Sequence, residues 1–416
     1  MELSRRVRSL PASSTLAVLA RARALRDRGA DVLAFAAGEP DFVTPEPICD
    51  AAIEALKAGL THYAPVPGDP DARAAIAEKL STENAIPGVT GDHVVITTGG
   101  KHALYLALQC LLDPAAPGAD PPEALLPTPA WVSYAPQIRL AGGKVVEVPT
   151  SAETGFVMTP DDLLAAVTPR TRVLIFNSPS NPCGVTYTPA QVEALADAIA
   201  HAAESTAPGL VVLADEIYEK LIFAGAEHRS LGSFAPIAQR VVTVGGLSKA
   251  YAMTGWRVGY LAGSGEPGAR LAAAVARMQS QTTTSLPAFI YPAIRVALMD
   301  CAADVEAMRA AFEARARIIH GRIRAMPGLV CPEPTGAFYV FPDVSAHFGK
   351  VSAGGTRIET PLDFAEALLE EHLVACVPGE DFLGAGRRCV RLSFACSEEQ
   401  IHAGMDRLEA FLAGLR

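Results

Sequence analysis

Residues 210–218 read LVVLADEIY, a run of five apolar residues followed by two acids, an isoleucine and a tyrosine. The run lacks the alternation of apolar and polar residues that is typical of a strand with one face in water. We therefore interpret Leu210–Ala214 as a strand buried on both faces, as in a parallel sheet covered by helices. Ligands of such sheets bind beyond the carboxyl ends of the strands, which is where Asp215 and Tyr218 follow.

Six further short runs rich in β-forming residues lie along the chain, and helical patterns separate most of them. Strands that alternate with helices predict an α/β domain, here with a mainly parallel sheet of seven strands. The other six predicted strands are Val94–Thr97, Ala124–Leu126, Lys144–Val148, Arg172–Phe176, Val241–Val244 and Val258–Ala262.

The character of the sequence changes after about residue 286. Residues 288–325 are dominated by helix formers, with neither Gly nor Pro between Ala293 and Gly321, and predict one long helix that links two domains. The C-terminal part then mixes short strands with helices, which predicts a smaller α+β domain. We expect three regions: an N-terminal arm with part of the small domain (1–45), the large domain (46–290), and the interdomain helix with the remaining small domain (291–416).

The composition argues against two classes of partner. The formal net charge is −10 and the pI is about 5.5, so the chain lacks the basic character of nucleic-acid-binding proteins. Arg21, Arg23 and Arg26 interrupt the apolar residues that follow the superficial twin-arginine motif Ser4-Arg5-Arg6, so we predict no signal peptide. No apolar stretch approaches the roughly 18 residues that a membrane span needs. We therefore expect neither a nucleic-acid partner nor a membrane partner.

Eight cysteines occur, none of them in a C-x-x-C pair, and most lie inside apolar runs. This pattern is typical of reduced thiols in a cytoplasmic protein, and it argues against a disulfide framework and against a metal site. We therefore expect a cytoplasmic protein that binds no metal ion.

Other stretches that carry chemically useful groups also lie at predicted strand ends. Residues 177–184 read NSPSNPCG, and Ser248-Lys249 comes soon after the strand that ends at Val244. Because strand ends meet at one sheet edge, an acid, an amide, an amine and the guanidinium of Arg257 should come together there. Gly99-Gly100-Lys101 forms a glycine turn that opens a helix, where free N–H groups suit a phosphate. These groups match the needs of pyridoxal 5'-phosphate (PLP), which wants an amine, a carboxylate and a phosphate site.

Several motifs in the right order carry a resemblance to a known family. They include AGEPDF at residues 37–42, SKAYAMTGWRVGY at residues 248–260 and VRLS at residues 390–393. The chain resembles, almost end to end, the class I aminotransferases of fold type I, in the subgroup of bacterial aspartate and prephenate aminotransferases. The resemblance implies an α/β fold-type I PLP-transferase that forms a homodimer with shared active sites. Its substrates would be an amino acid and a 2-oxo acid.

The resemblance also implies roles for the residues that would contact the reactive part of the cofactor. Lys249 resembles the lysine that joins PLP as a Schiff base and later moves the α-proton of the substrate. Asp215 resembles the carboxylate that keeps the pyridine nitrogen protonated, so that the ring can accept electrons. Tyr218 and Asn181 resemble the donors to the ring oxygen of the cofactor.

A second group of residues corresponds to the phosphate site of the family. Arg257 resembles the phosphate arginine, and the backbone at Gly100 and Lys101 would assist it. Tyr63 is similar to a tyrosine that reaches the phosphate from the partner subunit. Many relatives carry Ser or Thr three residues before the lysine, whereas this chain has Gly246, so we expect one phosphate contact to be lost or replaced.

A third group corresponds to the substrate site. Arg391 resembles the guanidinium fork that grips the α-carboxylate of the substrate, a bidentate task for which lysine is a poor substitute. Gly38 would add a backbone contact, and Asn181 would contribute to the same end of the site. Trp131 resembles the aromatic residue that stacks on the cofactor ring, and Phe338 would form a wall of the site.

The identity of the amino donor rests on fewer residues. Lys101 resembles a lysine that meets the distal carboxylate in aspartate-type relatives, and Ser13 and Thr15 align with N-terminal residues that close over the same group. These residues favour aspartate or another dicarboxylic donor. Pro11 occupies a position where several relatives carry a basic residue linked to prephenate, which disfavours prephenate without excluding it. Aromatic and alanine-type donors stay open.

The implied reaction is a ping-pong transfer of the amino group to a 2-oxo acid such as 2-oxoglutarate. A PLP-dependent lyase on the same scaffold is the enzymatic alternative, because it would share the lysine and the arginine. A ligand-sensing domain of a transcription regulator is the non-enzymatic alternative. It would carry an N-terminal winged-helix module, for which the aminotransferase-like part, starting near residue 5, leaves no room in this sequence.

Overall fold

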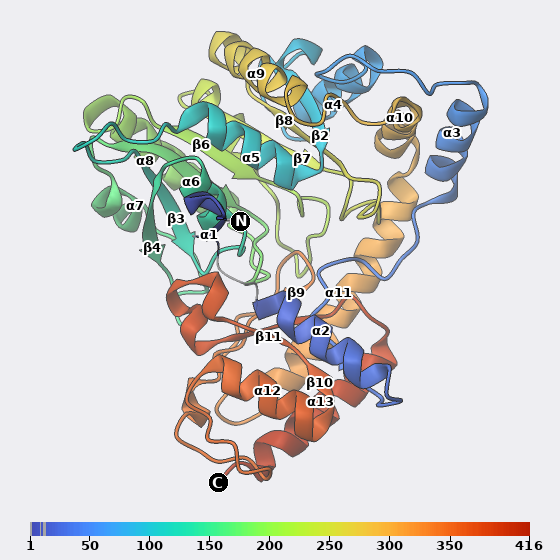
Figure 1. Cartoon of the computed structure of the whole chain (residues 1–416), viewed down its shortest axis with the longest axis vertical. Coiled ribbons are helices and arrows are strands. Elements are labelled where there is room, and N and C mark those ends of the chain that lie inside the picture. Colours follow the sequence, from blue (N-terminus) through green and yellow to red (C-terminus); the bar gives the residue numbers. More distant parts are fainter. Residues whose placement is uncertain (1, 9, 11–13) are drawn as a thin grey trace.

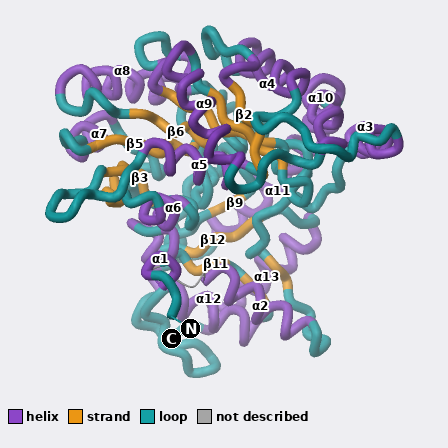
Figure 2. Tube along the Cα trace, turned by 45° about the horizontal axis from the view of Figure 1, so that its top comes forward, coloured by secondary structure: helices purple, strands orange, loops and turns teal. Residues whose placement is uncertain are grey.

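The computed structural model describes residues 2–8, 10 and 14–416. Figure 1 shows two parts, with a large sheet and its helices above and the C-terminal helices below. Figure 2 shows the strands of the upper part, in orange, surrounded by purple helices. None of the helices in these residues is both long enough and apolar enough to cross a membrane.

The sheet of the upper part has seven strands in the order β2-β8-β7-β6-β5-β3-β4, and β8 runs antiparallel to both of its neighbours. The other neighbours pair in parallel, so the predicted mainly parallel seven-stranded sheet is confirmed. The strands are β2 (Val94–Thr98), β8 (Val258–Ala262), β7 (Val241–Gly246), β6 (Val211–Asp215), β5 (Thr171–Asn177), β3 (Glu123–Thr128) and β4 (Lys144–Pro149).

Helices cover both faces of this sheet, which explains why strands such as β6 carry apolar residues on both faces. Within β6, Leu213 packs in a cluster with α5, α6 and α9, whereas Val212 and Ala214 pack in a second cluster with α7 and α8. Successive residues of a strand point to opposite faces, so both faces need apolar side chains. The helices of the upper part are α3 (Glu46–Lys57), α4 (Pro70–Thr82), α5 (Gly100–Leu111), α6 (Tyr134–Leu140), α7 (Pro160–Ala166), α8 (Pro189–Ser205), α9 (Gly265–Ser280) and α10 (Tyr291–Asp300).

The lower part joins the two ends of the chain. The short strand β1 (Leu33–Ala34) pairs in parallel with β10 (Val374–Ala375), and the N-terminal helix α2 packs beside α12 in a cluster that contains Val18 and Leu369. The N-terminal segment therefore packs against the C-terminal part of the chain. Apart from α1 (Arg5–Arg8), the remaining elements are α2 (Ser14–Arg26), α11 (Ala302–Ala325), β9 (Tyr339–Val340), α12 (Pro361–His372), β11 (Val377–Pro378), β12 (Val390–Ser393) and α13 (Glu398–Gly414).

Short 3₁₀ turns connect several of these elements. They are η1 (Gly91–His93), η2 (Leu231–Ser233), η3 (Ala238–Arg240), η4 (Ala288–Ile290), η5 (Ser345–His347), η6 (Glu380–Phe382) and η7 (Gly384–Arg388). Residues 113–122 form no helix or strand and are largely exposed.

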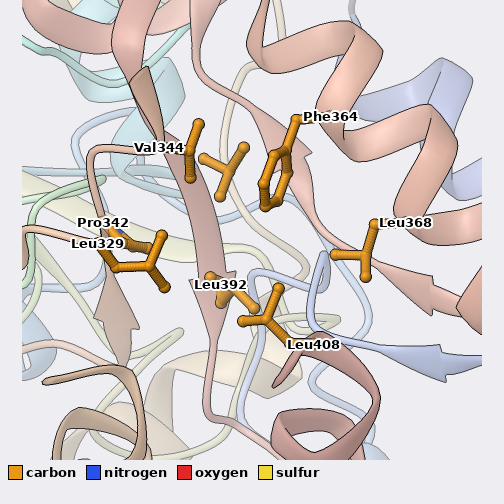
Figure 3. A pocket seen from close by; sticks show the side chains of 8 residues that line it. Leu329, Pro342, Val344, Phe364, Leu368, Leu392 and Leu408 are labelled. Atoms are coloured by element: carbon orange, nitrogen blue, oxygen red, sulfur yellow. The ribbon is translucent and has the colours of Figure 1, made fainter. Parts of the chain in front are cut away.

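The core of the lower part is made of aliphatic and aromatic side chains. Figure 3 shows Phe364 and Leu368 of α12 turned toward Leu392 of β12 and Leu408 of α13. The space that these side chains enclose leaves no room for a water molecule. Such close packing holds β12 in place, and β12 also carries Arg391.

The prediction of one long helix over residues 288–325 is wrong. The segment forms η4, then α10, then α11, with a break at Cys301, whose backbone has φ −106° and ψ 24°. The two helices pack into different clusters, because Ile294 of α10 contacts α3 and α4 whereas Phe312 of α11 contacts the lower part. Helix propensity carries no information on which neighbours a helix packs against. The helix formers on both sides of Cys301 therefore predicted one continuous helix.

Candidate functional site

The carboxyl ends of three neighbouring strands lie side by side, as the sequence predicts. In the register of the sheet, Asn177 of β5 pairs with Asp215 of β6, and Asp215 pairs with Val244 of β7. The Asn177 side chain donates a hydrogen bond of 2.8 Å to the backbone oxygen of Asp215. The sheet therefore presents Asp215 at the edge where Lys249 follows β7.

Asp215 is a buried carboxyl group that makes two hydrogen bonds. Its Oδ2 accepts from the hydroxyl of Tyr134 at 2.7 Å, and its Oδ1 accepts from the backbone N–H of Ile217 at 3.2 Å. Burial raises the pKa of Asp215 to about 6, although both hydrogen bonds oppose the shift. It makes no ion pair with any residue that the structure describes. The carboxylate is therefore suited to a cationic ligand.

Lys249 lies beside one aromatic residue from each of the two parts of the chain. Its Nζ donates a hydrogen bond to the backbone oxygen of Gly38 and lies 5.6 Å from the centre of the Phe338 ring and 5.9 Å from that of Tyr218. Burial, and after it the charge of Arg391, lowers the pKa of Lys249 to about 8. An amine with this pKa can both accept and release a proton near neutral pH.

Arg391 is a buried cation that has neutral partners. Nη1 donates to Oδ1 of Asn181 at 3.0 Å, and Nη2 donates to the backbone oxygen of Ala36 at 3.2 Å. The guanidinium carbon lies 4.6 Å from the centre of the Tyr339 ring and 5.3 Å from that of Phe382. Among the described residues Nε has no hydrogen-bond partner and no carboxylate forms an ion pair with the group. Because a buried charge is costly unless it is paired, this site favours an anionic ligand.

Tyr218 joins these groups through its hydroxyl. It shares a hydrogen bond of 3.0 Å with the hydroxyl of Tyr339, and its ring meets that of Phe338 edge-on at 5.5 Å. Burial, and after it the neighbouring Tyr339, raises the pKa of Tyr218 well above its ordinary value. The phenol is therefore protonated at neutral pH and can donate a hydrogen bond.

The start of α5 forms a cradle next to Arg257. A side chain on Gly99, which has φ 80°, would place its Cβ 2.5 Å from Nη2 of Arg257, and a Cβ on Gly259 would lie 2.2 Å from the backbone nitrogen of Gly100. The amides of Gly100 and Lys101 have no acceptor within the part of the chain that the structure describes. Free amides at a helix start beside a guanidinium suit a phosphate group.

Gly246, the position at which the sequence lacks a Ser or Thr, leaves no space for a side chain. A Cβ at this position would lie 2.8 Å from the backbone oxygen of Val258 and 3.0 Å from Cδ1 of Ile217. The close approach of β7 and β8 at this point is the physical reason. A serine or threonine at residue 246 would require the two strands to move apart.

The other predicted residues divide into those that lie near this cradle and those that do not. Nζ of Lys101 lies 4.9 Å from the centre of the Trp131 ring, and Trp131 meets Tyr134 edge-on at 5.3 Å. Partial burial, and after it the charge of Arg257, lowers the pKa of Lys101.

Tyr63 is 94% exposed and lies apart from these contacts. Ser13 and Pro11 lie outside the described residues, as does the side chain of Thr15.

A separate buried cluster of polar residues lies behind Asp215. Ligand atoms of Glu216, Glu219 and His228 lie within 4.8 Å of one another, a spacing that could hold a metal ion. However, the ammonium group of Lys79 forms an ion pair with Glu219, and the amide of Asn84 donates to Glu216 at 3.0 Å and to Glu219 at 2.6 Å. These internal donors already occupy the carboxylate oxygens, so the cluster favours a structural role.

Sequence reasoning missed two tyrosines that contact the predicted residues. Tyr134 lies three positions after Trp131 and donates to Asp215, and Tyr339 follows Phe338 directly and contacts both Tyr218 and Arg391. The one signal in the sequence was that each tyrosine lies close to a predicted site residue. That signal does not predict which of the neighbouring side chains points into the site.

Known proteins resemble this chain over almost its full length. The family described as "Aminotransferase class I and II" matches residues 30–408. The aspartate/prephenate aminotransferase of Thermus thermophilus is 42% identical over 99% of this chain and 98% of its own length. The aspartate aminotransferase of Geobacillus stearothermophilus is 39% identical over 99% of each chain. A solved structure of the Thermus thermophilus aspartate aminotransferase with maleate has a TM-score of 0.88 at 41% identity, over 99% of this chain and all of that one.

We predict that Tyr134→Phe raises the pKa of Asp215 above its value of about 6, because the lost hydroxyl favours the ionised carboxylate. Loss of one hydrogen bond to a charged group should move the midpoint by about one pH unit or more. The carboxylate then gains its proton at a higher pH than in the unmodified protein. Carbon NMR of aspartate-labelled, cofactor-free protein measures this midpoint. Tyr187→Phe, which removes a buried hydroxyl elsewhere, is the control, and an equal midpoint in all three proteins would contradict the prediction.

Proposed function

Because this chain belongs to the class I and II aminotransferase family, we propose that it moves the amino group of aspartate, or another dicarboxylic amino acid, to a 2-oxo acid such as 2-oxoglutarate. Like its family, the enzyme depends on PLP. One observation carries the proposal. A single amine with a pKa of about 8, that of Lys249, lies close to a buried guanidinium that lacks a carboxylate partner within the described chain.

The groups of the site fit PLP when each is compared with a part of the cofactor. Asp215 has no cationic partner among the described side chains and would hold a protonated ring nitrogen. The protonated phenol of Tyr218 would donate to the ring oxygen, with Asn181 as a second donor. The free amides of Gly100 and Lys101, together with Arg257, would hold the phosphate.

The protein's own residues would then divide the work of the reaction. When bound, PLP supplies an aldehyde that takes up the amino group and a ring that accepts electrons from the substrate. Arg391 binds the α-carboxylate, and its hydrogen bond to Asn181 sets the plane of the fork. Lys249 accepts the proton from Cα at its Nζ, a task for which its lowered pKa suits it. Asp215 carries a negative charge above a pH of about 6, so the end of the site away from Arg391 is anionic.

Two features support a dicarboxylic donor. Lys101 is a second cation beside Trp131 and could pair with a distal carboxylate. Relatives that match almost the whole chain are named for aspartate, and one of the solved structures contains maleate, a dicarboxylate. Two carboxylates on the substrate would thus meet two cations of the protein.

We predict that Lys249→Ala lowers the rate of amino transfer from aspartate by roughly a thousand-fold or more, because both the covalent attachment and the proton acceptor are lost. Absorbance of the PLP-loaded protein, mixed with aspartate alone, follows the half-reaction. Lys144→Ala, which changes a 55% exposed lysine on β4, should react at the normal rate. Full activity of the Lys249 variant would exclude the assignment. Release of a cleaved product without conversion of the cofactor would indicate a lyase instead.

We predict that Lys101→Met lowers kcat/KM for aspartate by roughly ten-fold or more, the usual loss when a charge-assisted hydrogen bond to a substrate is removed. Activity with alanine and phenylalanine should change by less than about two-fold, because these donors have no distal carboxylate. The comparison of the three donors in one preparation gives the result. An equal loss for all three would mean that Lys101 serves the cofactor and not the donor.

We propose a homodimer with shared active sites on the basis of an apolar hollow beside the site. The hollow, of about 900 Å³, is lined by Ile53, Leu56 and Phe289 and reaches Arg257 of the cradle. Ile53 and Leu56 are 47% and 49% exposed and line the same hollow, and contiguous exposed apolar side chains mark a contact surface. A second copy would cover them and bring its own Tyr63 to the phosphate.

We predict that sedimentation equilibrium gives twice the 43.5 kDa mass of one chain, and that Ile53→Asp shifts the protein toward single chains. Burying an unpaired carboxylate in an interface costs several kcal/mol, which is the reason for the shift. Val43→Asp changes an 88% exposed apolar residue outside the hollow and serves as the control. A fully active single chain at low concentration would contradict the shared site.

We further propose that the enzyme works in a reducing compartment such as the cytoplasm. All eight cysteines are free thiols, and several of them are buried. Proteins of oxidising compartments tend to use such residues in disulfides. Fractionation of the source cells would test this location, and recovery of the enzyme outside the cytoplasm would contradict it.

A further inference from the structure

Tyr339 contacts two residues that have separate tasks in the proposed reaction. Its hydroxyl lies 3.0 Å from the hydroxyl of Tyr218, the predicted donor to the ring oxygen of the cofactor. Its ring face lies 4.6 Å from the guanidinium of Arg391, the predicted fork for the substrate carboxylate. One side chain therefore touches both the cofactor side and the substrate side of the site.

The position of Tyr339 is fixed at both ends. Its backbone lies in β9, where it pairs with Ser393 of β12, and its carbonyl oxygen approaches Gly184 so closely that a Cβ there would lie 2.1 Å away. At the other end, a Cβ on Gly38 would come within 3.3 Å of the Tyr339 hydroxyl. The side chain is 1% exposed. It has little freedom to turn away from Tyr218 or Arg391.

Packing alone does not account for a tyrosine at this position. A phenylalanine would fill the same space and keep the ring beneath Arg391, but the buried hydroxyl of Tyr218 would lose its one partner among the described residues. Leaving a buried polar group without a partner is costly. Burial raises the pKa of Tyr339, so its hydroxyl keeps its proton at neutral pH. Either hydroxyl of the pair can donate, and Tyr339 must be the donor when Tyr218 gives its one proton to the cofactor.

We infer that Tyr339 is a positioning residue that holds Arg391 by its ring and Tyr218 by its hydroxyl, so that the carboxylate fork and the cofactor phenol keep a fixed relation. The inference rests on the proposed function, because Tyr218 and Arg391 take their tasks from it. By donating to the oxygen of Tyr218, Tyr339 polarises the Tyr218 hydroxyl and makes it a stronger donor to the cofactor. The ring face of Tyr339 attracts the guanidinium and fixes the plane of its fork.

Two substitutions separate the two contacts. Tyr339→Phe keeps the ring and removes the hydroxyl, whereas Tyr339→Leu removes both. The PLP-loaded protein is examined without turnover, by the pH midpoint of the cofactor's absorbance and by the dissociation constant of succinate, an unreactive dicarboxylate. Tyr187→Phe is the matched control, because Tyr187 is also buried and its hydroxyl oxygen accepts a hydrogen bond of 2.9 Å from the backbone N–H of Met158.

For Tyr339→Phe we expect the pH midpoint to rise by about half a unit or more, because Tyr218 becomes a weaker donor to the anionic ring oxygen. The dissociation constant of succinate should stay within about two-fold, because the ring remains. For Tyr339→Leu we expect succinate to bind roughly five-fold or more weakly, in addition to the change in midpoint. Tyr187→Phe should change neither quantity.

An unchanged midpoint in Tyr339→Phe, or unchanged succinate binding in Tyr339→Leu, would overturn the inference. A structural role alone would lower the melting temperature of both variants without moving the midpoint of the folded protein, which also counts against it. Neither measurement requires turnover of aspartate. If the unmodified enzyme binds succinate but does not convert aspartate, the proposed donor is wrong, and the two readouts still decide the role of Tyr339.

Discussion

The burial of two opposite charges that are not paired with each other is the constraint on which the rest of this site depends. Asp215 is 4% exposed and Arg391 is 5% exposed, and within the described chain both are stabilised by neutral hydrogen-bond partners and not by an ion pair. Removing a charge from water costs several kcal/mol, and neutral partners offset part of that cost. A ligand with a cationic end and an anionic end would offset more of it. The cluster of Lys79, Glu216, Glu219 and His228 provides the contrast, because Lys79 pairs with Glu219 and His228 contacts Glu216.

Burial also lowers the pKa of the amine of Lys249, which lies between these charges. Lys249 lies within 6 Å of two aromatic ring centres, at 5.6 Å and 5.9 Å, and close enough to Arg391 for the positive charge to disfavour its own protonation. Both effects lower its pKa toward neutrality, whereas burial raises the pKa of Asp215 toward neutrality from below. An acid and a base with shifted pKa values in one place are typical of catalytic sites.

The site also depends on the contact between the two parts of the chain. The large sheet supplies Asp215 and Lys249, whereas β9 and β12 of the lower part supply Tyr339 and Arg391. Gly184 lets the segment after β5 approach the backbone of Tyr339 without a clash, because it has φ 70° and no Cβ. The apolar core around Leu392 then keeps β12 in position (Figure 3). Movement of one part relative to the other would change the relation of the amine to the guanidinium.

The sequence by itself determined the sheet and the main chemical groups. Continuous apolar strands predicted burial on both faces, and the groups after their carboxyl ends, such as Asp215 and Lys249, predicted a shared edge, because parallel strands place these ends together. Only the tertiary structure decided which side chains meet across long separations. The predicted long helix ends at Cys301, where the chain changes its packing partner. Packing also places Tyr134 against Asp215 and Tyr339 against Tyr218. Local patterns record the periodicity of one element, whereas these contacts arise from packing between elements, which no local pattern contains.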